Sequence, residues 1–147
     1  MTQVNITEDL LYSRHDTDLP LFYYKGESVT RKQMMQAVSE LASHLSHYIE
    51  PGDNVIIYMN DSPSLVSAFL AAIACGAIPS VVNPKMKSSG LQYLLELTDA
   101  RLVFTSISKA TYIPHSCDFE VIYAEDDESV AISDFSLGKG DPGWREE

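Results

Sequence analysis

The chain has 147 residues, of which 45% are hydrophobic, and its formal net charge is −11. This length and apolar content suit one domain with a true hydrophobic core. So acidic a surface repels a phosphate backbone, and we therefore expect no nucleic-acid partner. Two cysteines are too few for a disulfide framework, so we expect reduced thiols in a cytoplasmic protein.

The first residues, MTQVNITEDLLYSRHD, are mixed and polar. They lack a cationic region followed by an apolar block, so we expect no secretory signal here. Within this stretch Ile6, Leu10 and Leu11 fall on one face of a predicted helix. Asn5 or Thr7 is the candidate cap of that helix.

The stretch LPLFYYKGESVT predicts a β-hairpin with strands at 21–24 and 28–29. Thr30 and Gln33 then match a capping box, which opens the longest predicted helix. We expect Pro51-Gly52 to end this helix. Its apolar positions at helical spacing are Met34, Val38, Leu41, Leu45 and Ile49.

The run NVIIYMN predicts a strand with both faces covered, because its apolar residues are continuous rather than alternating. Residues 65–82 carry no charge and are nearly long enough to span a membrane. However, Ser62 and Pro63 supply a helix start, Gly76 supplies a helix end, and Pro79 interrupts the run again. We therefore expect a helix, a turn and a second buried strand, AIPSVVN, and no membrane span.

A further helix is expected to start at Ser88 or Ser89, with Leu91, Leu94 and Leu95 on its apolar face. RLVFTS, FEVIYA and SVAIS predict later strands. Helices and apolar strands thus alternate, which is typical of the α/β class with a largely parallel β-sheet flanked by helices. We expect this domain to span residues 1–137 and residues 138–147, rich in glycine and proline, to be a linker or a cut end.

Few residues carry chemistry that spacing alone reveals. His44 and His47 are three apart, but a metal site needs three or four ligands and no third ligand has a matching spacing. EDDE at 125–128 lacks the pattern of a calcium loop, and GKGDPG at 138–143 lacks the spacing of a phosphate loop. Tyr58 is expected to be a core or edge aromatic. We therefore expect no metal site. Spacing also reveals no catalytic residue, and the alternative of a Ser-His-Asp or Cys-His arrangement assembled from distant residues stays open.

The order of these features nevertheless resembles a known family. The features are a helix led by Thr30, Pro51-Gly52-Asp53 before a valine-rich strand, Asp61-Ser62-Pro63 before a helix, Gly76-Ala77, and Asn83-Pro84. In order and spacing they are similar to the N-terminal region of the AMP-forming acyl- and aryl-CoA ligases of the adenylate-forming superfamily. The likeness covers roughly residues 6–106 and is greatest to ligases of the benzoate and anthranilate type.

The resemblance implies a parent enzyme that uses ATP, Mg²⁺, CoA and a small carboxylic acid. It also implies that the basic residue after Asn83-Pro84 faces the 3′-phosphate of CoA. That residue is Lys85, with Lys87 as a near neighbour, and the alternative is that both are ordinary exposed lysines. Gly90 departs from the family pattern, which often has a glutamate in this helix.

The family's phosphate loop, ribose-binding aspartate, magnesium-binding glutamate and C-terminal lysine have no counterpart in the 147 residues. We therefore expect an N-terminal ligase fragment that is inactive alone and whose partner is the remainder of the ligase chain. Two alternatives stay open: part of a peptide-synthetase adenylation domain, and a free-standing binding module without catalysis. An apolar face exposed for docking would also let the isolated chain self-associate.

Overall fold

The structure is a computed structural model that describes residues 5–7, 10–11, 19–114, 119–124 and 135–138. Cys117, the EDDE stretch, the predicted strand SVAIS and residues 139–147 lie outside these ranges. The predictions made for them, including the linker, stay predictions.

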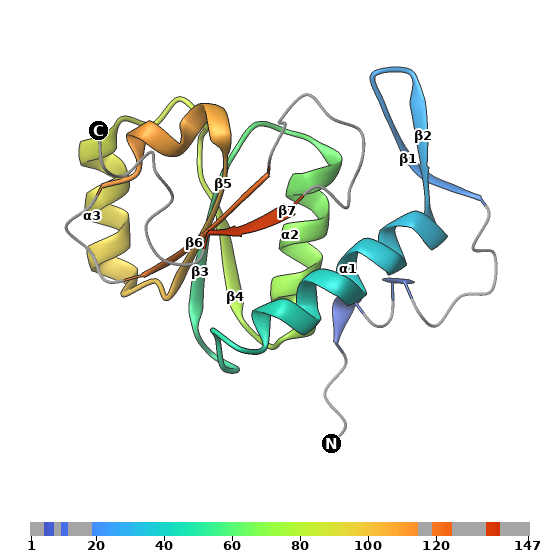
Figure 1. Ribbon diagram of the computed structural model, residues 1–147, viewed down its shortest axis with the longest axis horizontal. Coiled ribbons are helices and arrows are strands. Elements are labelled where there is room, and N and C mark those ends of the chain that lie inside the picture. Colours follow the sequence, from blue (N-terminus) through green and yellow to red (C-terminus); the bar gives the residue numbers. More distant parts are fainter. Residues whose placement is uncertain (1–4, 8–9, 12–18, 115–118, 125–134, 139–147) are drawn as a thin grey trace.

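A β-hairpin stands apart from the main sheet (Figure 1). Its strands β1 (Pro20–Tyr24) and β2 (Glu27–Thr30) pair antiparallel. The turn residues Lys25 and Gly26 both have positive φ angles, 51° and 81°. A two-residue hairpin turn of type I′ requires this backbone conformation at both positions. The predicted hairpin is confirmed.

In the part of the chain that the structure describes, the main sheet has five strands in the order β4-β3-β5-β6-β7. The strands β3 (Asn54–Tyr58), β4 (Ile78–Val81), β5 (Leu102–Ser106) and β6 (Glu120–Ala124) run parallel. Strand β7 (Phe135–Gly138), which the sequence did not predict, pairs antiparallel with β6. The α/β class with a largely parallel sheet is confirmed.

Three helices cover the two faces of this sheet (Figure 1). The helices α1 (Arg31–Leu45) and α2 (Pro63–Ala74) pack on one face, and α3 (Ser88–Thr98) packs on the other. A 3₁₀ helix, η2 (Ile107–Tyr112), follows β5. The molecule therefore has three layers, helix, sheet and helix, with one hydrophobic cluster on each side of the sheet.

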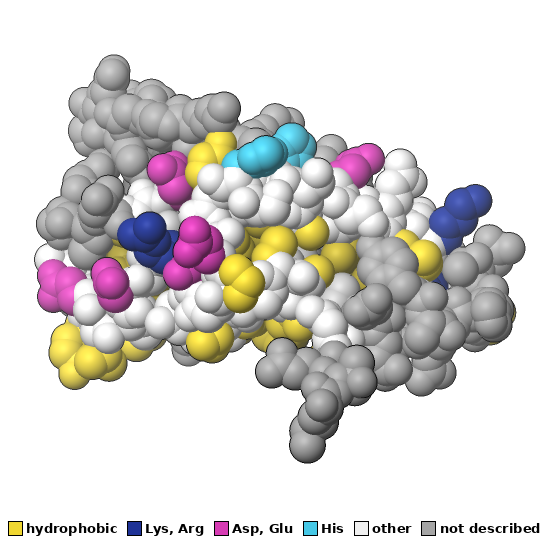
Figure 2. All heavy atoms as spheres, turned by 90° about the horizontal axis from the view of Figure 1, so that it is seen from below, with side chains coloured by type: hydrophobic (Ala, Val, Ile, Leu, Met, Phe, Trp, Pro, Cys, Tyr) yellow, Lys and Arg dark blue, Asp and Glu magenta, His cyan; other side chains and the backbone are white. Residues whose placement is uncertain are grey.

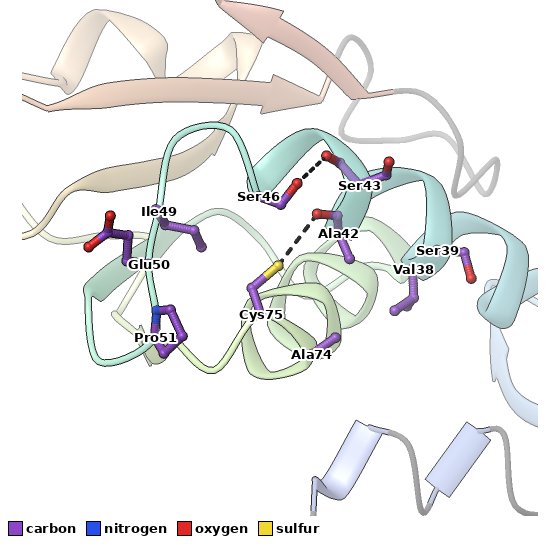
Figure 3. A pocket seen from close by; sticks show the side chains of 10 residues that line it. All are labelled: Val38, Ser39, Ala42, Ser43, Ser46, Ile49, Glu50, Pro51, Ala74 and Cys75. Carbon is purple, nitrogen blue, oxygen red and sulfur yellow. Dashed lines mark hydrogen bonds between the residues drawn. The ribbon is translucent and has the colours of Figure 1, made fainter.

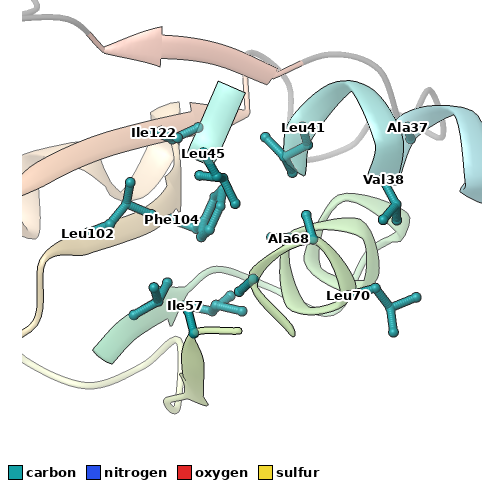
Figure 4. Packing of buried hydrophobic residues seen from close by; sticks show 14 of the residues in the cluster. Ala37, Val38, Leu41, Leu45, Ile57, Ala68, Leu70, Leu102, Phe104 and Ile122 are labelled. Carbon is teal, nitrogen blue, oxygen red and sulfur yellow. The ribbon is translucent and has the colours of Figure 1, made fainter. Parts of the chain in front are cut away.

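Strand β3 shows why both faces are apolar. Side chains alternate along a strand, so Val55 and Ile57 join the cluster of α1 and α2, which Figure 4 shows, while Ile56 and Tyr58 join the cluster of α3. All four are at most 1% exposed. The continuous apolar run was the correct signal for a central strand with both faces covered.

Helix α2 begins and ends where its capping residues predicted. The Ser62 hydroxyl oxygen accepts a hydrogen bond from the Leu65 amide at 3.2 Å, and Pro63 occupies the first helical position. Gly76, with φ 77°, turns the chain after the helix. Within the described ranges, no helix has the length and apolar content that crossing a membrane requires.

Helix α1 begins at the predicted capping box but ends earlier than expected. Its last residue is Leu45, six residues before Pro51. The Ser46 hydroxyl donates to the Ser43 carbonyl oxygen at 2.7 Å, and such local bonds compete with helix continuation. Ile49 is still buried, at 5% exposed, but it reaches the core from a loop rather than from a helical turn.

Strand β4 was predicted to be buried, and this prediction is wrong. It is an edge strand of the sheet that the structure describes, and Ile78 and Val81 are 53% and 48% exposed. Proline lacks an amide hydrogen and is confined to edge strands and bulges, so Pro79 was the overlooked signal.

The N-terminal face was also predicted incorrectly. Leu11 is fully buried and Leu10 is partly buried, but Ile6 is 63% exposed. Thr7 is buried instead, and its hydroxyl donates to the Leu70 carbonyl oxygen at 2.7 Å. Of the two candidate caps, Asn5 is the one that accepts the Thr7 amide, at 3.0 Å.

Candidate functional site

The strand order places a crevice at one edge of the sheet. The chain passes from β3 outward to β4 through α2, and then crosses to the other side of β3 through α3 to reach β5. Helices α2 and α3 lie on opposite faces, so the chain reverses its direction of winding between β3 and β5. In open parallel sheets, ligands bind outside the carboxyl ends of strands at such a reversal.

A pocket of about 580 Å³ lies at this position. Three segments line it, at the carboxyl ends of β4, β3 and β5. Tyr58 is the last residue of β3, residues 84–89 follow β4, and Lys109 and Tyr112 belong to η2 after β5. The pocket is therefore assembled by the sheet from segments that are distant in the sequence.

Both lysines that the sequence singled out, Lys85 and Lys87, line this pocket and are exposed. They lie on a tight turn that Asn83 organises. The Asn83 side-chain oxygen accepts the Lys85 amide at 2.9 Å, and the Asn83 carbonyl oxygen accepts the Met86 amide at 3.0 Å. Their binding of a CoA phosphate stays a prediction.

The structure adds two residues that sequence reasoning did not connect with this site. The Lys109 ammonium donates to the Pro84 carbonyl oxygen at 2.9 Å and lies 5.7 Å from the centroid of the Tyr58 ring. The Tyr58 hydroxyl donates to the Met86 carbonyl oxygen at 2.7 Å. Tyr58 is a core aromatic as predicted, since it is 1% exposed, yet its polar end reaches the pocket.

The charge of the pocket is positive. Lys85, Lys87 and Lys109 line it, and among the residues that the structure describes no acidic side chain does. Helix α3 begins at Ser88, and the preceding Lys87 gives its first turn no side-chain cap. Lysine ammonium groups are good phosphate ligands, and a helix N-terminus favours an anion. The arrangement suits a phosphate group.

Tyr58 remains a neutral hydrogen-bond donor in this setting. Burial, and secondly the neighbouring Tyr112, raise the pKa of the Tyr58 phenol above its ordinary value of 10.0. The neutral phenol keeps its proton directed at the Met86 carbonyl oxygen. It therefore contributes a fixed contact rather than an acid or a base.

A second hollow, of about 660 Å³, lies between α1 and α2 beside Cys75 (Figure 3). The Cys75 thiol donates to the Ala42 carbonyl oxygen at 3.4 Å. Burial raises its pKa, which disfavours the thiolate that nucleophilic chemistry requires. This cysteine therefore behaves as a packed thiol rather than as a nucleophile.

His44 and His47 are exposed, and Figure 2 shows the histidine side chains in cyan on the surface. No group of three or more His, Cys, Asp or Glu in the described part of the chain could hold a metal ion.

The chain is thus a doubly wound α/β domain with a basic pocket at the carboxyl ends of its parallel strands. Comparison with known proteins gives its family. Residues 12–141 match the family model described as AMP-binding enzyme. The chain belongs to the AMP-binding enzyme family.

Curated relatives include CoA ligases. An anthranilate–CoA ligase of Pseudomonas aeruginosa is 40% identical over 102 residues, which are 69% of this chain and 20% of the ligase. A 3-hydroxybenzoate–CoA ligase of Aromatoleum sp. is 27% identical over 88 residues, which are 59% of this chain and 17% of the ligase. The chain thus spans about a fifth of these relatives.

Solved structures share the fold. A benzoate CoA ligase from Burkholderia xenovorans superimposes with a TM-score of 0.71 and 21% identity, over 90% of this chain and 28% of that chain. MatB from Rhodopseudomonas palustris gives a TM-score of 0.75 and 17% identity, over 88% of this chain and 27% of that chain. The domain therefore has the fold of one part of these enzymes.

Proposed function

We propose that this chain is the N-terminal part of an AMP-forming ligase that joins an aromatic or other small carboxylic acid to CoA. The observation that carries the proposal is the 40% identity to an anthranilate–CoA ligase of which the chain spans 20%. In the complete enzyme, the acid would attack the α-phosphate of Mg-ATP to give an acyl adenylate and pyrophosphate. The CoA thiol would then displace AMP.

The contribution of this chain would be to bind CoA. The pocket at the carboxyl edge of the sheet holds Lys85 and Lys87 on a tight turn beside the start of α3. A 3′-phosphate carries the charge that these groups favour, and it needs no metal to bind there. The acid, the adenylate and the magnesium ion would contact the remainder of the ligase.

The isolated chain is therefore expected to be inactive and not to bind Mg-ATP tightly. The first test is to read the coding sequence past Glu147. A glycine-rich phosphate-loop motif within a few tens of codons would support the ligase fragment, whereas a stop codon there would favour a free-standing binding module. Calorimetry provides a second test, since tight Mg-ATP binding by this chain alone would contradict its inactivity.

Replacing Lys85 by alanine tests the CoA site in the full-length enzyme. A charge-assisted hydrogen bond contributes about 1.5–3 kcal/mol, so we expect the Michaelis constant for CoA to rise roughly tenfold or more, with that for ATP unchanged. Lys32→Ala, which removes an exposed lysine on α1, is the matched control. An unchanged constant for CoA in Lys85→Ala would remove Lys85 from the site.

A carrier protein is the alternative acceptor. The adenylation domain of a Klebsiella oxytoca peptide-synthetase fusion, NpsA-ThdA, shares the fold with a TM-score of 0.66 at 21% identity. This likeness concerns the fold alone, and the higher identity to a CoA ligase favours CoA. An acceptor assay with CoA and with a carrier protein distinguishes the two.

The remaining partner would be the rest of the ligase polypeptide. Large apolar side chains on β4 and α3, among them Ile78, Val81 and Leu97, are 48–66% exposed, which suits surfaces that the rest of the enzyme covers. In its absence we expect the isolated, cytoplasmic chain to self-associate. Sedimentation velocity showing only monomer at high concentration would contradict this expectation.

A further inference from the structure

The turn that carries Lys85 is attached to two other parts of the fold. Pro84, on one side of Lys85, has its carbonyl oxygen bound by the Lys109 ammonium at 2.9 Å. Met86, on the other side, has its carbonyl oxygen bound by the Tyr58 hydroxyl at 2.7 Å. The backbone is thus held by a side chain immediately before and immediately after Lys85.

Lys109 differs from the two lysines on the turn. Lys85 and Lys87 are exposed, whereas Lys109 is half-buried. Its ammonium has a carbonyl oxygen as partner and lies 5.7 Å from the centroid of the Tyr58 ring, within the range of a cation–π contact. The same ring carries the hydroxyl that binds Met86. Lys109 and Tyr58 therefore contact each other, and each donates a hydrogen bond to the backbone of the turn.

The element that carries Lys109 also contacts the start of α3. The Ser88 hydroxyl donates to the carbonyl oxygen of Tyr112 at 2.8 Å, and both Lys109 and Tyr112 belong to η2. The 3₁₀ helix after β5 thus holds the turn at Pro84 and the first helical residue at Ser88. The segment between them contains both pocket lysines of the turn.

We propose that Lys109 is a positioning residue of the phosphate site, which fixes the turn 83–87 through the Pro84 carbonyl oxygen so that Lys85 and Lys87 face one anion. Its effect on CoA rests on the proposed function, but its effect on the turn does not. An ammonium that acted only through its charge would help to bind phosphate without ordering the backbone. The two roles therefore predict different results.

The ordering of the backbone of the turn 83–87 can be measured by amide hydrogen exchange of the 147-residue chain without any ligand. In Lys109→Met the Pro84 carbonyl oxygen loses its donor. We expect the amides of Lys85 and Met86 to exchange roughly tenfold faster or more, as the loss of a hydrogen bond to a charged group implies. Lys109→Arg keeps the charge and the donors and should restore most of the protection. Lys32→Met, which removes one positive charge on α1, is the control and should change nothing at the turn.

The Michaelis constant for CoA in the full-length enzyme gives the second readout. Lys109→Met should raise it several-fold, and Lys109→Arg should raise it much less. Unchanged exchange in Lys109→Met would overturn the proposal, whatever happens to CoA binding, and so would an arginine variant that exchanges as fast as the methionine variant.

If the pocket did not bind CoA at all, the two measurements would give a different combination of results. In that case Lys85→Ala would leave the Michaelis constant for CoA unchanged, while exchange at the turn would still respond to Lys109→Met. The positioning role at the turn would then stand without its proposed ligand.

Discussion

At the scale of single residues, Tyr58 shows how one side chain links the core to the pocket. Its ring is buried at the end of β3 against the cluster of α3, and its hydroxyl holds the Met86 carbonyl oxygen at 2.7 Å. A buried tyrosine needs such a partner, because an unpaired hydroxyl would cost free energy. The partner here is the turn that carries Lys85.

Replacing Tyr58 by phenylalanine should change the pH dependence of stability. The pKa of Tyr58 is raised in the folded chain, so its stabilising effect is complete below pH 10.0 and is lost as the pH rises above that value. The free energy of unfolding should therefore fall more steeply above about pH 10 in the native chain than in Tyr58→Phe. At neutral pH the variant should lose about 1 kcal/mol with its hydrogen bond.

Urea denaturation at several pH values measures both effects. Tyr93→Phe is the matched control, because Tyr93 is 64% exposed. Parallel curves for the native chain and Tyr58→Phe above pH 10 would contradict the prediction.

The pocket also shows which site residues can be predicted from the sequence and which cannot. Lys85 and Lys87 were found because they follow Asn83-Pro84 in a pattern that resembles a family. Tyr58 and Lys109 lie more than twenty residues away on either side, and only the pairing of β3 with β5 brings them together. No local pattern carries that information, since strand order depends on contacts between distant segments.

At the scale of elements, boundaries with strong capping signals were predicted well and the others were not. Ser62, Pro63 and Gly76 set the limits of α2, and Thr30 with Gln33 set the start of α1. The end of α1 was predicted too late, because Pro51 is a strong helix-ending signal. The hydrogen bond from the Ser46 hydroxyl to the Ser43 carbonyl oxygen, which competes with the helix, cannot be recognised from the sequence pattern. A tertiary or local contact can end a helix before its obvious stop signal.

Gly76 joins two elements and should be sensitive to substitution. Its φ of 77° disfavours a side chain, and a Cβ there would lie 3.1 Å from the Pro51 Cβ. The Gly76 carbonyl oxygen also accepts the Gly52 amide at 2.9 Å. We expect Gly76→Ala to lower the free energy of unfolding by about 1–3 kcal/mol.

Gly52→Ala is the control that separates the cost of a positive φ from the cost of the contact between a Cβ at residue 76 and Pro51. Gly52 also has a positive φ, 91°, but a Cβ there would meet nothing within 4 Å. We expect this control to lose only about 1 kcal/mol, measured by the same chemical denaturation. Equal losses in the two variants would show that contact with Pro51 adds nothing.

At the scale of the whole molecule, the alternation of helices and apolar strands was sufficient to predict the layered α/β architecture. It was not sufficient to predict the strand order. A run such as AIPSVVN is apolar whether its strand lies at the centre or at the edge, and β4 is an edge strand of the described sheet. Only Pro79 distinguishes the two cases within the run itself.

Pro79 has a further effect at this edge. The Ile78 amide donates to the carbonyl oxygen of Asp53, just before β3, at 2.8 Å, and the Val82 amide donates to Ile57 of β3 at 3.0 Å. The backbone groups of the alternating residues Pro79 and Val81 therefore point away from β3. Of these two, only Val81 has an amide hydrogen to offer to another strand. The outer edge of β4 is therefore a poor template for adding a strand.

Restoring the missing amide hydrogen should make the chain prone to assembly. We expect Pro79→Val to form aggregates that bind thioflavin at concentrations where the native chain does not. Val81→Thr, which keeps Pro79, is the control. A variant that stays as free of fibrils as the native chain would show that another feature protects the edge.

This edge matters most while a protein is being made. An N-terminal domain leaves the ribosome and folds before the residues that will later cover it exist. If the chain continues past Glu147 as we propose, the outer edge of β4 stays exposed while several hundred further codons are translated. A proline in its middle would then act as a safeguard of biosynthesis, keeping nascent chains on neighbouring ribosomes from pairing with one another.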